Sequence, residues 1–490
     1  MYKKLFLLTT VAGLMLIGCN EVDCCISSVI EADPSEIVLG GLEDATETLN
    51  LTCPISWQIT GTIPEWLEVG PPSGTGTPAT VTLTFKAKSN NTTGANRPVE
   101  TLTFLAANGD KFLVTVTQIA MPQTFIVRYE PNRDPTTVNN MPADHTKTSG
   151  VPLTLSSNIP THAGWYFELW NTEADGSGTA YDLGDSYTLD ADLTLYAQWT
   201  DWVPMRTVEE LAALATAVNG GNSMSGVKYK LVRNLDLTDY LSSSGGGYNA
   251  GRGWIAIGGA VAAERPFSGI FDGNGLTISG LYIDDNTTAP ETLNVGLFGA
   301  VSGGTVQNLH VEIAAGGITN SGTGTLGGIA GFVTAGSTIQ NCSVTGGPVA
   351  SSTSYGYVGG IAAEVGSGSN SIVNCYTTVS VSGRAFVGGV VGYLGGSVIN
   401  CVALNPSISS FGGGTTNFGR VSGNTTGGLT NNWANQAMTV LGSSVTDGTG
   451  SNRNGADCVA KPAESWWTTN ANWNFTNIWT MGADGYPKLK

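Results

Sequence analysis

Few side chains in the C-terminal half of the chain are of a type that performs acid–base chemistry. From Ile313 to Val440 the sequence has one acid, Glu364, two bases, Arg384 and Arg420, and no histidine. Polysaccharide-cleaving enzymes need clustered carboxyl groups, and acid–base catalysis needs a titratable group beside the reacting atom. No HExxH, GxSxG or CxxC pattern occurs. We therefore predict no catalytic residue, no metal and no cofactor.

One cysteine near the N-terminus is predicted to carry lipid. Lys3 and Lys4 precede an apolar run, 5–17, that is too short to span a bilayer comfortably. The run ends in Leu-Ile-Gly-Cys at 16–19, which resembles a bacterial lipobox. That resemblance implies a signal peptide at 1–18, acylation of Cys19 and membrane contact through this lipid only. The alternative is an ordinary cleaved signal with an incidental cysteine.

The residues after Cys19 are acidic. Asn20–Asp23 (NEVD) resembles the surface-export signal of Bacteroidetes lipoproteins, which implies an outer-membrane protein that faces the cell exterior. Residues 19–30 are predicted to form a lipidated tether, and the alternative to an export signal is that this solvated tether happens to be acidic. The formal net charge of the chain is −17. Such a surface argues against binding to nucleic acid or to anionic lipid.

The composition favours an all-β protein of several domains. Charged residues are 12% of the 490 residues, and glycine alone occurs 67 times. This balance is typical of strands joined by tight turns, and the length suggests about three domains.

Residues 31–120 alternate between apolar and polar side chains with a period of two. Strands are expected at 80–88, 101–106 and 112–116, with a two-residue hairpin turn at Asn108-Gly109. The stretch resembles the BACON domain, which implies an immunoglobulin-like sandwich and a role in carbohydrate binding. The residues that carry the resemblance are Trp57, 64–69 (PEWLEV), 73–76 (SGTG), 90–93 (NNTT), Arg97 and 116–118 (VTQ). Trp57 and Trp66 are either sugar-stacking platforms or, as we favour, core residues.

Residues 121–201 have a second β pattern. A strand at 125–130 is followed by 164–172 (GWYFELWNT), 175–179 (DGSGT) and 193–199 (LTLYAQW). This series resembles the Listeria-Bacteroides repeat, also called the internalin B-type repeat. The resemblance implies a small β-grasp-like module that acts as a stalk or spacer in surface proteins.

Residues 203–490 begin with a predicted helix. Thr207 and Glu210 have capping-box spacing, and apolar residues from Val208 to Val218 then recur at helical intervals before Gly220-Gly221. A lone amphipathic helix needs an apolar partner. We expect it to cover the open end of a stack of β-coils, which also blocks edge-to-edge aggregation.

A repeat follows the helix. Four Gly-rich segments, at 295–299, 326–331, 358–362 and 387–392, each precede a strand that ends near an asparagine: Asn308, Asn341, Asn374 and Asn400. Equivalent positions recur at roughly 26–33 residues. The pattern resembles the GLUG motif of bacterial surface proteins. It implies a right-handed β-solenoid with repeats at about 293–402 and a C-terminal closure at 403–490.

The repeats predict which residues stack between coils. Inward Val, Ile and Leu build the core, and the four asparagines form an interior ladder of amide hydrogen bonds. Cys342, Cys375 and Cys401 stack beside them as small buried hydrophobes. The sequence does not decide whether these cysteines and Cys458 form disulfides, although a disulfide between coils would strain the stack.

The tail is rich in aromatic residues, among them Trp466, Trp467 and Trp473. We expect it to cover the far end of the stack, and a sugar-binding platform is the alternative. The domain order predicts a lipid-anchored surface adhesin that binds host or microbial glycans or extracellular-matrix proteins. The alternatives are a polysaccharide-degrading β-helix enzyme and a purely structural surface or fimbria-associated component.

Overall fold

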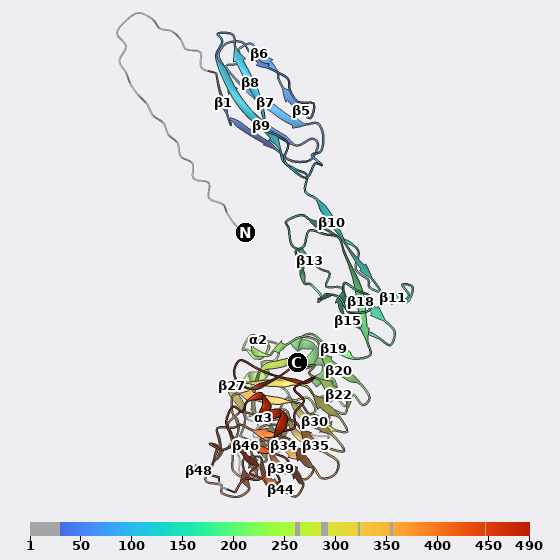
Figure 1. The fold of residues 1–490 in the computed structure, drawn as a ribbon, viewed down its shortest axis with the longest axis vertical. Helices are drawn as coiled ribbons and strands as arrows, with labels where there is room; N and C mark the ends of the chain where they lie inside the picture. The colour runs from blue at the N-terminus through green and yellow to red at the C-terminus, as the bar shows by residue number, and fades with distance from the viewer. Residues whose placement is uncertain (1–29, 260–264, 286–292, 322–323, 353–355, 446) are drawn as a thin grey trace, which may run out of the picture. The chain divides into compact units, whose positions relative to one another are not determined.

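The computed structural model describes residues 30–259, 265–285, 293–321, 324–352, 356–445 and 447–490 (Figure 1). Strands predominate, so the all-β prediction is confirmed. The described part of the chain has three α-helices: α1 (Val208–Asn219), α2 (Thr238–Leu241) and α3 (Glu464–Thr469). The chain divides into two compact units, each described below by itself: 1–128 with 144–155 and 186–193, and 129–143 with 156–185 and 194–490.

The first unit contains a sandwich of two sheets around one apolar core. One sheet has the order β1 (Glu31–Asp33), β3 (Thr46–Thr52), β7 (Thr80–Ala87), β5 (Leu67–Gly70). The other has the order β2 (Glu36–Leu39), β9 (Lys111–Gln118), β8 (Glu100–Ala106), β4 (Trp57–Thr60), β6 (Ser73–Gly74). Alternate side chains such as Leu83, Phe85, Phe104 and Val114 are buried between the sheets. The period of two therefore places the core as predicted.

The predicted hairpin between β8 and β9 forms with a longer loop than expected. Ala106 N–H donates to Asp110 O at 2.9 Å, so three residues lie between the closing pair. Of the two expected turn residues, Gly109 has a positive φ, 95°, and Asn108 does not. The reason is local: Asp110 N–H donates to the side-chain oxygen of Asn108 at 3.1 Å, which favours a turn completed by one left-handed glycine.

Short strands follow in both units. In the first unit β10 (Thr124–Glu130) pairs antiparallel with β12 (His145–Thr148), and β13 (Leu153–Thr154) pairs with β17 (Ser186–Tyr187). In the second, β11 (Val138–Asn139) pairs with β14 (Thr161–His162), and β15 (Tyr166–Asn171) pairs with β16 (Ala180–Tyr181) and β18 (Leu193–Thr200). The buried Asn171 amide bonds to the backbone of Gly176 and Gly178, which fixes the DGSGT turn.

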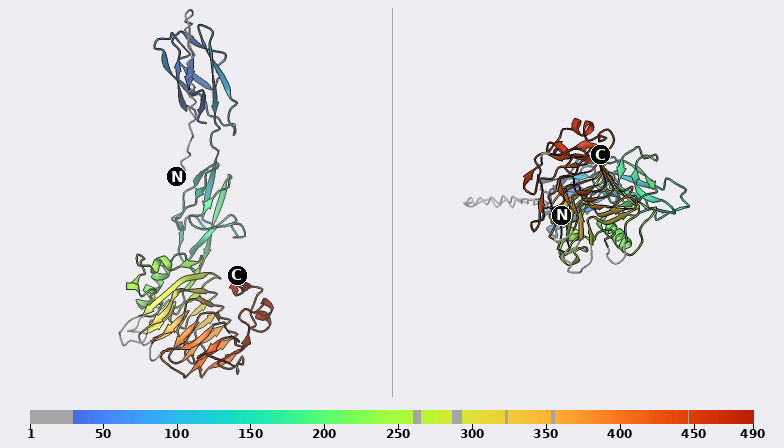
Figure 2. Two further views of the ribbon diagram at one scale, coloured as in Figure 1. Left: turned by 90° about the vertical axis from the view of Figure 1, so that its left-hand side faces the viewer. Right: turned by 90° about the horizontal axis from the view of Figure 1, so that it is seen from below.

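The described residues between 203 and 458 form a stack of coils whose equivalent strands pair in parallel, and only the short pair 439–440 with 443–444 among the named strands is antiparallel (Figure 2). One sheet runs the length of the stack: β19 (Val203–Met205), β20 (Lys228–Leu231), β22 (Ile270–Asp272), β26 (Thr305–Gln307), β30 (Thr338–Gln340), β35 (Ser371–Val373), β40 (Ser397–Ile399), β45 (Gly428–Thr430). Equivalent residues pair from coil to coil, as in Val306, Ile339, Ile372 and Val398. The predicted solenoid is therefore confirmed.

Three further groups of strands complete the coils. One five-stranded sheet contains β24 (Leu293–Val295), β28 (Gly324–Gly327), β33 (Val358–Gly359), β38 (Val387–Gly388), β43 (Phe418–Gly419). A second contains β25 (Phe298–Ser302), β29 (Ala330–Thr334), β34 (Ala362–Val365), β39 (Val391–Leu394), β44 (Ser422–Thr425). The largest contains β21 (Leu235–Asp236), β23 (Thr277–Asp285), β27 (His310–Asn320), β31 (Ser343–Gly346), β32 (Val349–Ser351), β36 (Tyr376–Thr377), β37 (Val381–Gly383), β41 (Val402–Ala403), β42 (Ser407–Ser410), β46 (Trp433–Asn435), β47 (Thr439–Val440), β48 (Ser443–Ser444), β49 (Ala456–Cys458). Strands at 418–440 continue the register of the preceding coil, so the repeat extends beyond 402.

Helix α1 covers the first end of the stack, as predicted. Glu210 N–H donates to Thr207 Oγ1 and Thr207 N–H donates to the Glu210 carboxylate, both at 3.2 Å. Leu211, Leu214 and Val218 are buried in the same apolar core as the coils. The helix therefore covers apolar side chains that the first coils would otherwise expose to water.

An asparagine ladder lies at one corner of the stack. Each of Asn341, Asn374 and Asn400 donates from its side-chain nitrogen to the side-chain oxygen of the asparagine one coil earlier, at 3.1–3.2 Å. The ladder continues to Asp272 before Asn308 and to Asn431 after Asn400. All five asparagines have φ between 51° and 54°, the left-handed region in which asparagine is tolerated. Most are half-buried, so the ladder lies at the corner rather than in the interior.

The cysteines of the stack that the structure describes are buried and form no disulfide bonds. Cys342, Cys375, Cys401 and Cys458 are free thiols, and the first three occupy equivalent positions beside the ladder. Burial raises the pKa of the Cys375 and Cys401 thiols, which disfavours the reactive thiolate. They act as small apolar core residues, as predicted.

The tail does not cover the far end of the stack, so that prediction is wrong. Helix α3 and the hairpin of β50 (Trp479–Met481) and β51 (Pro487–Leu489) pack along the side of the coils (Figure 2). Tyr376 Oη donates to Pro487 O at 2.9 Å, and Trp473 Nε1 donates to Asn400 O at 2.8 Å. Tyr376 and Val402 share one apolar cluster with the tail tryptophans, and this contact holds the tail on the side of the stack.

Among the residues described, none of the helices is both long enough and apolar enough to cross a membrane.

Replacement of Asn341 by alanine is expected to destabilise the solenoid. The change removes two ladder hydrogen bonds. It also places alanine at φ 51°, a left-handed backbone conformation that asparagine tolerates better because its polar side chain can form local hydrogen bonds. We expect a loss of about 2–4 kcal/mol. Thermal unfolding should show a lower melting temperature for Asn341→Ala than for Asn341→Gly, because glycine keeps the left-handed backbone without strain. An unchanged melting temperature in both variants would contradict a stabilising ladder.

Candidate functional site

A group of half-buried aromatic residues surrounds Glu364 on the surface of the solenoid. We call Phe332, Tyr357, Glu364, Phe386 and Tyr393 the aromatic face. Phe332, Glu364 and Tyr393 are register partners on β29, β34 and β39, so they form one outward row with the spacing of neighbouring strands. Tyr357 lies directly before β33 and Phe386 directly before β38, in the segment of the coil that precedes β34 and β39. The repeat thus brings together residues that are far apart in sequence.

The rings of the aromatic face contact one another directly. Tyr357 and Tyr393 are stacked, with centroids 5.2 Å apart and planes inclined by 23°. Phe386 lies edge-on to Tyr357, with centroids 5.0 Å apart. Phe386 has φ 55°, which is uncommon for a bulky residue and typical of positions under functional constraint. Packing of this kind fixes the ring orientations before any ligand arrives.

Glu364 gives the aromatic face one negative charge. Burial raises the pKa of its carboxyl group, and burial followed by the nearby Glu364 charge raises the pKa of the Tyr357 hydroxyl. Within the described ranges no residue forms a hydrogen bond or ion pair with this carboxylate. It is therefore a hydrogen-bond acceptor with unused capacity.

The chemistry of this arrangement is binding. Aromatic ring faces pack on apolar faces of a ligand, and a carboxylate accepts hydrogen bonds from hydroxyl or amino groups. Glycoside hydrolysis needs a second carboxyl group across the scissile bond. Glu364 is the single acid between residues 313 and 440. The five residues of the aromatic face therefore do not include the second carboxyl group that glycoside hydrolysis needs.

Three of the tryptophans considered as sugar platforms are buried, which agrees with the core position favoured for Trp57 and argues against the alternative platform role of Trp467 and Trp473. Trp57 is 4% exposed, Trp467 0% and Trp473 2%, so none has an open ring face for a sugar. Trp57 fills the sandwich core beside Phe104, and the other two anchor the tail. Their large apolar area is used for packing.

The two other tryptophans are half-buried. Trp66 lies under the Arg97 guanidinium, 5.3 Å from its ring centroid, in the first unit. Trp466 packs edge-on against Trp433 at 5.1 Å in the second. Trp466 also packs edge-on against Trp467, with centroids 5.3 Å apart, so the three tail candidates share one packed aromatic cluster. Cys19 lies outside the described residues, and its lipidation stays a prediction.

His310, the single histidine of the solenoid region, has structural partners. Its Nδ1 lies 2.7 Å from Ser343 Oγ and its Nε2 3.2 Å from Thr345 Oγ1. Burial lowers the pKa of the imidazole to about 4, so the ring is neutral near pH 7. In the part of the chain that the structure describes, no group of three His, Cys, Asp or Glu side chains is placed to hold a metal ion.

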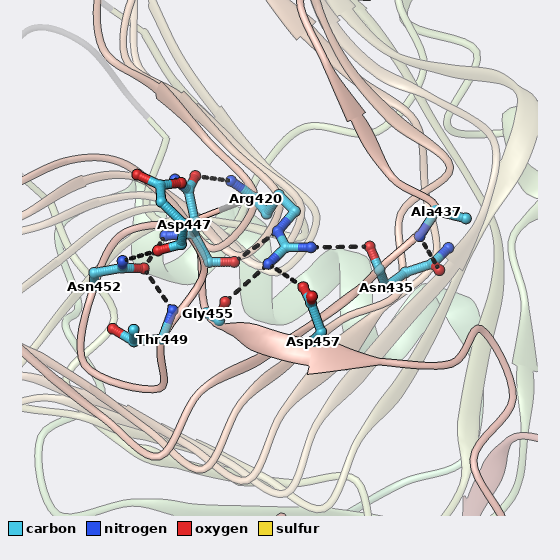
Figure 3. Close-up of polar contacts among 9 residues, drawn as sticks. Arg420, Asn435, Ala437, Asp447, Thr449, Asn452, Gly455 and Asp457 are labelled. Carbon is cyan, nitrogen blue, oxygen red and sulfur yellow. Dashed lines mark hydrogen bonds and ion pairs between the residues drawn. The ribbon is translucent and has the colours of Figure 1, made fainter. Parts of the chain in front are cut away.

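Arg420 closes the far end of the stack, a role that the sequence analysis did not predict. Its side chain is fully buried and bonds to Asn454 O and Gly455 O, both at 2.9 Å (Figure 3). It also pairs with Asp457 at 2.7 Å. Asp447, Thr449 and Asn452 continue the network, which holds the segment 447–458 over the last coil. Arg420 is thus a structural residue rather than a catalytic base.

A signal for the aromatic face is present in the sequence. Tyr357 and Phe386 each stand directly before a Val-Gly-Gly sequence. Phe332 and Tyr393 each directly follow the last glycine of a Gly-rich repeat segment, 326–331 or 387–392. Aromatic residues at equivalent positions of successive repeats must lie side by side once the coils stack. These aromatic residues can be found when the outward positions of successive repeats are compared in the sequence, and not only the inward positions.

A cavity of about 450 Å³ lies at the other end of the stack. It is lined by α1 and by residues 240–255, and its walls are mainly apolar, with Ala215, Leu241, Trp254 and Ile255 among them. The volume is within the range of small-molecule pockets. Asn219, one of its few polar residues, already bonds to Ala256 O and Gly258 N–H.

Comparison with known proteins identifies one domain. Residues 125–198 match the family model of the Listeria-Bacteroides repeat domain, which confirms the predicted repeat. Over 321 residues the chain is 32% identical to halomucin of Haloquadratum walsbyi (strain DSM 16790 / HBSQ001). That match covers 61% of this chain and 3% of halomucin, so the chain spans a small fraction of this relative.

Two solved structures from Bacteroides ovatus show weak likeness. The crystal structure of a candidate immunoglobulin A1 protease is 19% identical, with 59% of this chain and 91% of that chain covered and a TM-score of 0.40. A GH5 xyloglucanase in complex with a heptasaccharide is 14% identical, with 32% and 30% covered and a TM-score of 0.18. Neither TM-score reaches 0.5, so neither structure bears on what this chain does.

Replacement of Arg420 by methionine is expected to release the segment 447–458. The change removes charged hydrogen bonds to buried carbonyl groups, with an expected loss of at least about 3 kcal/mol. Trypsin should then cleave after Arg453 faster than in the wild type, as followed by mass spectrometry of the fragments. Arg252→Met, at an exposed arginine, is the matched control. Equal cleavage rates in the wild type and Arg420→Met would refute this role.

Proposed function

We propose that this chain is a lipid-anchored cell-surface protein that binds glycans at the aromatic face and has no catalytic activity. The single observation that carries the binding proposal is the fixed group of three contacting rings, Tyr357, Phe386 and Tyr393, around the unpaired carboxylate of Glu364. A rigid ring platform loses little conformational entropy when a ligand stacks on it.

Several observations support a place at the cell surface. The Listeria-Bacteroides repeat at 125–198 resembles modules of surface proteins, and the lipobox-like sequence at 16–19 suits an outer-membrane anchor. Halomucin is similar to this chain over 61% of the length of this chain. On this proposal the sandwich and the repeat module act as spacers, and the solenoid presents the aromatic face to host or microbial glycans.

An enzymatic role is the weaker candidate, because the aromatic face offers one carboxyl group where hydrolysis needs two. Matrix-protein binding remains a second possibility for the same rings. A screen of residues 20–490 against glycan and extracellular-matrix arrays separates these functions, and a parallel assay for new reducing ends tests hydrolysis.

Substitution of the two stacked tyrosines tests the assignment. The double variant Tyr357→Ala/Tyr393→Ala should bind the best array glycan about 10- to 100-fold more weakly, since each lost ring contact is worth roughly 1 kcal/mol or more. Titration calorimetry measures the affinity, and circular dichroism checks the fold.

Two controls make this result specific. Tyr357→Phe/Tyr393→Phe keeps the rings and should retain most of the affinity. Tyr248→Ala removes an exposed ring elsewhere on the solenoid and should have no effect. Full affinity in the alanine double variant would place the glycan site outside the aromatic face.

A further inference from the structure

The charges around the aromatic face are uneven. Glu364 supplies one carboxylate, and its register partners Phe332 and Tyr393 are uncharged. Arg384, the base nearest to Phe386 in sequence, directs its guanidinium towards Gly412 in the neighbouring turn. The five residues that define the aromatic face thus supply one carboxylate and four ring faces.

Both kinds of group attract positive charge. The face of an aromatic ring is the negative pole of its quadrupole, so a cation near a Tyr or Phe ring is stabilised. A carboxylate forms its strongest hydrogen bonds with charged donors, and partial burial reduces the screening by water. An acidic sugar at this place would be repelled by Glu364, and a neutral one would leave its charge unpaired.

We propose that the aromatic face prefers glycans that carry a free, protonated amino group, such as glucosamine units without an N-acetyl group. The ammonium group pairs with Glu364, and the sugar ring stacks on Tyr357 or Tyr393. This inference rests on the proposed glycan-binding function and adds the class of sugar. Burial raises the pKa of the Glu364 carboxyl group, and a bound ammonium group lowers it again and keeps the group ionised.

Two oligosaccharides of equal length test the preference. The full chain after its predicted signal peptide, residues 20–490, is titrated at about pH 6, where an aliphatic amine is protonated. One probe is a glucosamine tetramer and the other is the N-acetylglucosamine tetramer. We expect the wild type to bind the free amine at least about tenfold more tightly.

Glu364→Gln should abolish the preference for the free amine, because glutamine keeps the shape of the side chain without its charge. Glu312→Gln removes an exposed carboxylate from β27 and should leave the preference intact. A preference that survives in Glu364→Gln, or that is lost in Glu312→Gln, refutes the inference, because it then reflects the overall negative charge.

The remaining outcomes separate the two proposals. Equal binding of both tetramers by the wild type, with loss in the tyrosine double variant, overturns the amino-sugar inference and leaves the proposed glycan function standing. If the wild type binds neither tetramer but binds other glycans on the array, the amino-sugar inference is likewise overturned and the proposed glycan function stands. If a lysine-rich peptide binds through Glu364 and the glucosamine tetramer does not, the ligand is a basic protein and the inference is wrong.

Discussion

Parallel hydrogen bonding between equivalent strands of successive coils is the constraint on which the rest of this protein depends. Because strand pairs with equivalent strand, any residue type at one position of the repeat is stacked on its counterpart in the next coil. At the ladder corner every coil must take the same left-handed turn, and asparagine both tolerates that backbone and bonds to its neighbour. The same register that stacks valines inside the coils stacks Phe332, Glu364 and Tyr393 outside them.

A stack of parallel strands also has two ends and several sides that must be protected from water or from other sheets. Helix α1 covers one end with apolar side chains, whereas the other end uses the buried Arg420 and the backbone of 447–458. The tail then covers the side formed by Tyr376 and Val402, where the outward positions are apolar. The aromatic face is the contrasting case, because its rings are half-buried and no segment of the described chain covers them.

The repeat, the ladder and the capping helix were predictable because each rests on local spacing: the interval between asparagines, the Thr207–Glu210 capping box and the apolar period of α1. The tail position was not, because Trp467 and Trp473 are apolar in any context, and their burial depends on a surface formed by residues about 60–100 positions earlier. The role of Arg420 was hidden for a related reason. Its partners are mostly backbone carbonyl groups, which leave no trace in residue types.

The scarcity of titratable side chains between residues 313 and 440 has a physical basis. A charge at a repeat position next to a like charge in the next coil would be destabilised by repulsion, so a regular stack selects neutral residues at most positions. A single carboxylate avoids that repulsion, which suits Glu364 between Phe332 and Tyr393. The scaffold therefore readily holds one charge among rings and only with difficulty the close pair of carboxylates that hydrolysis requires. A ring platform with one acceptor is therefore compatible with a long regular stack.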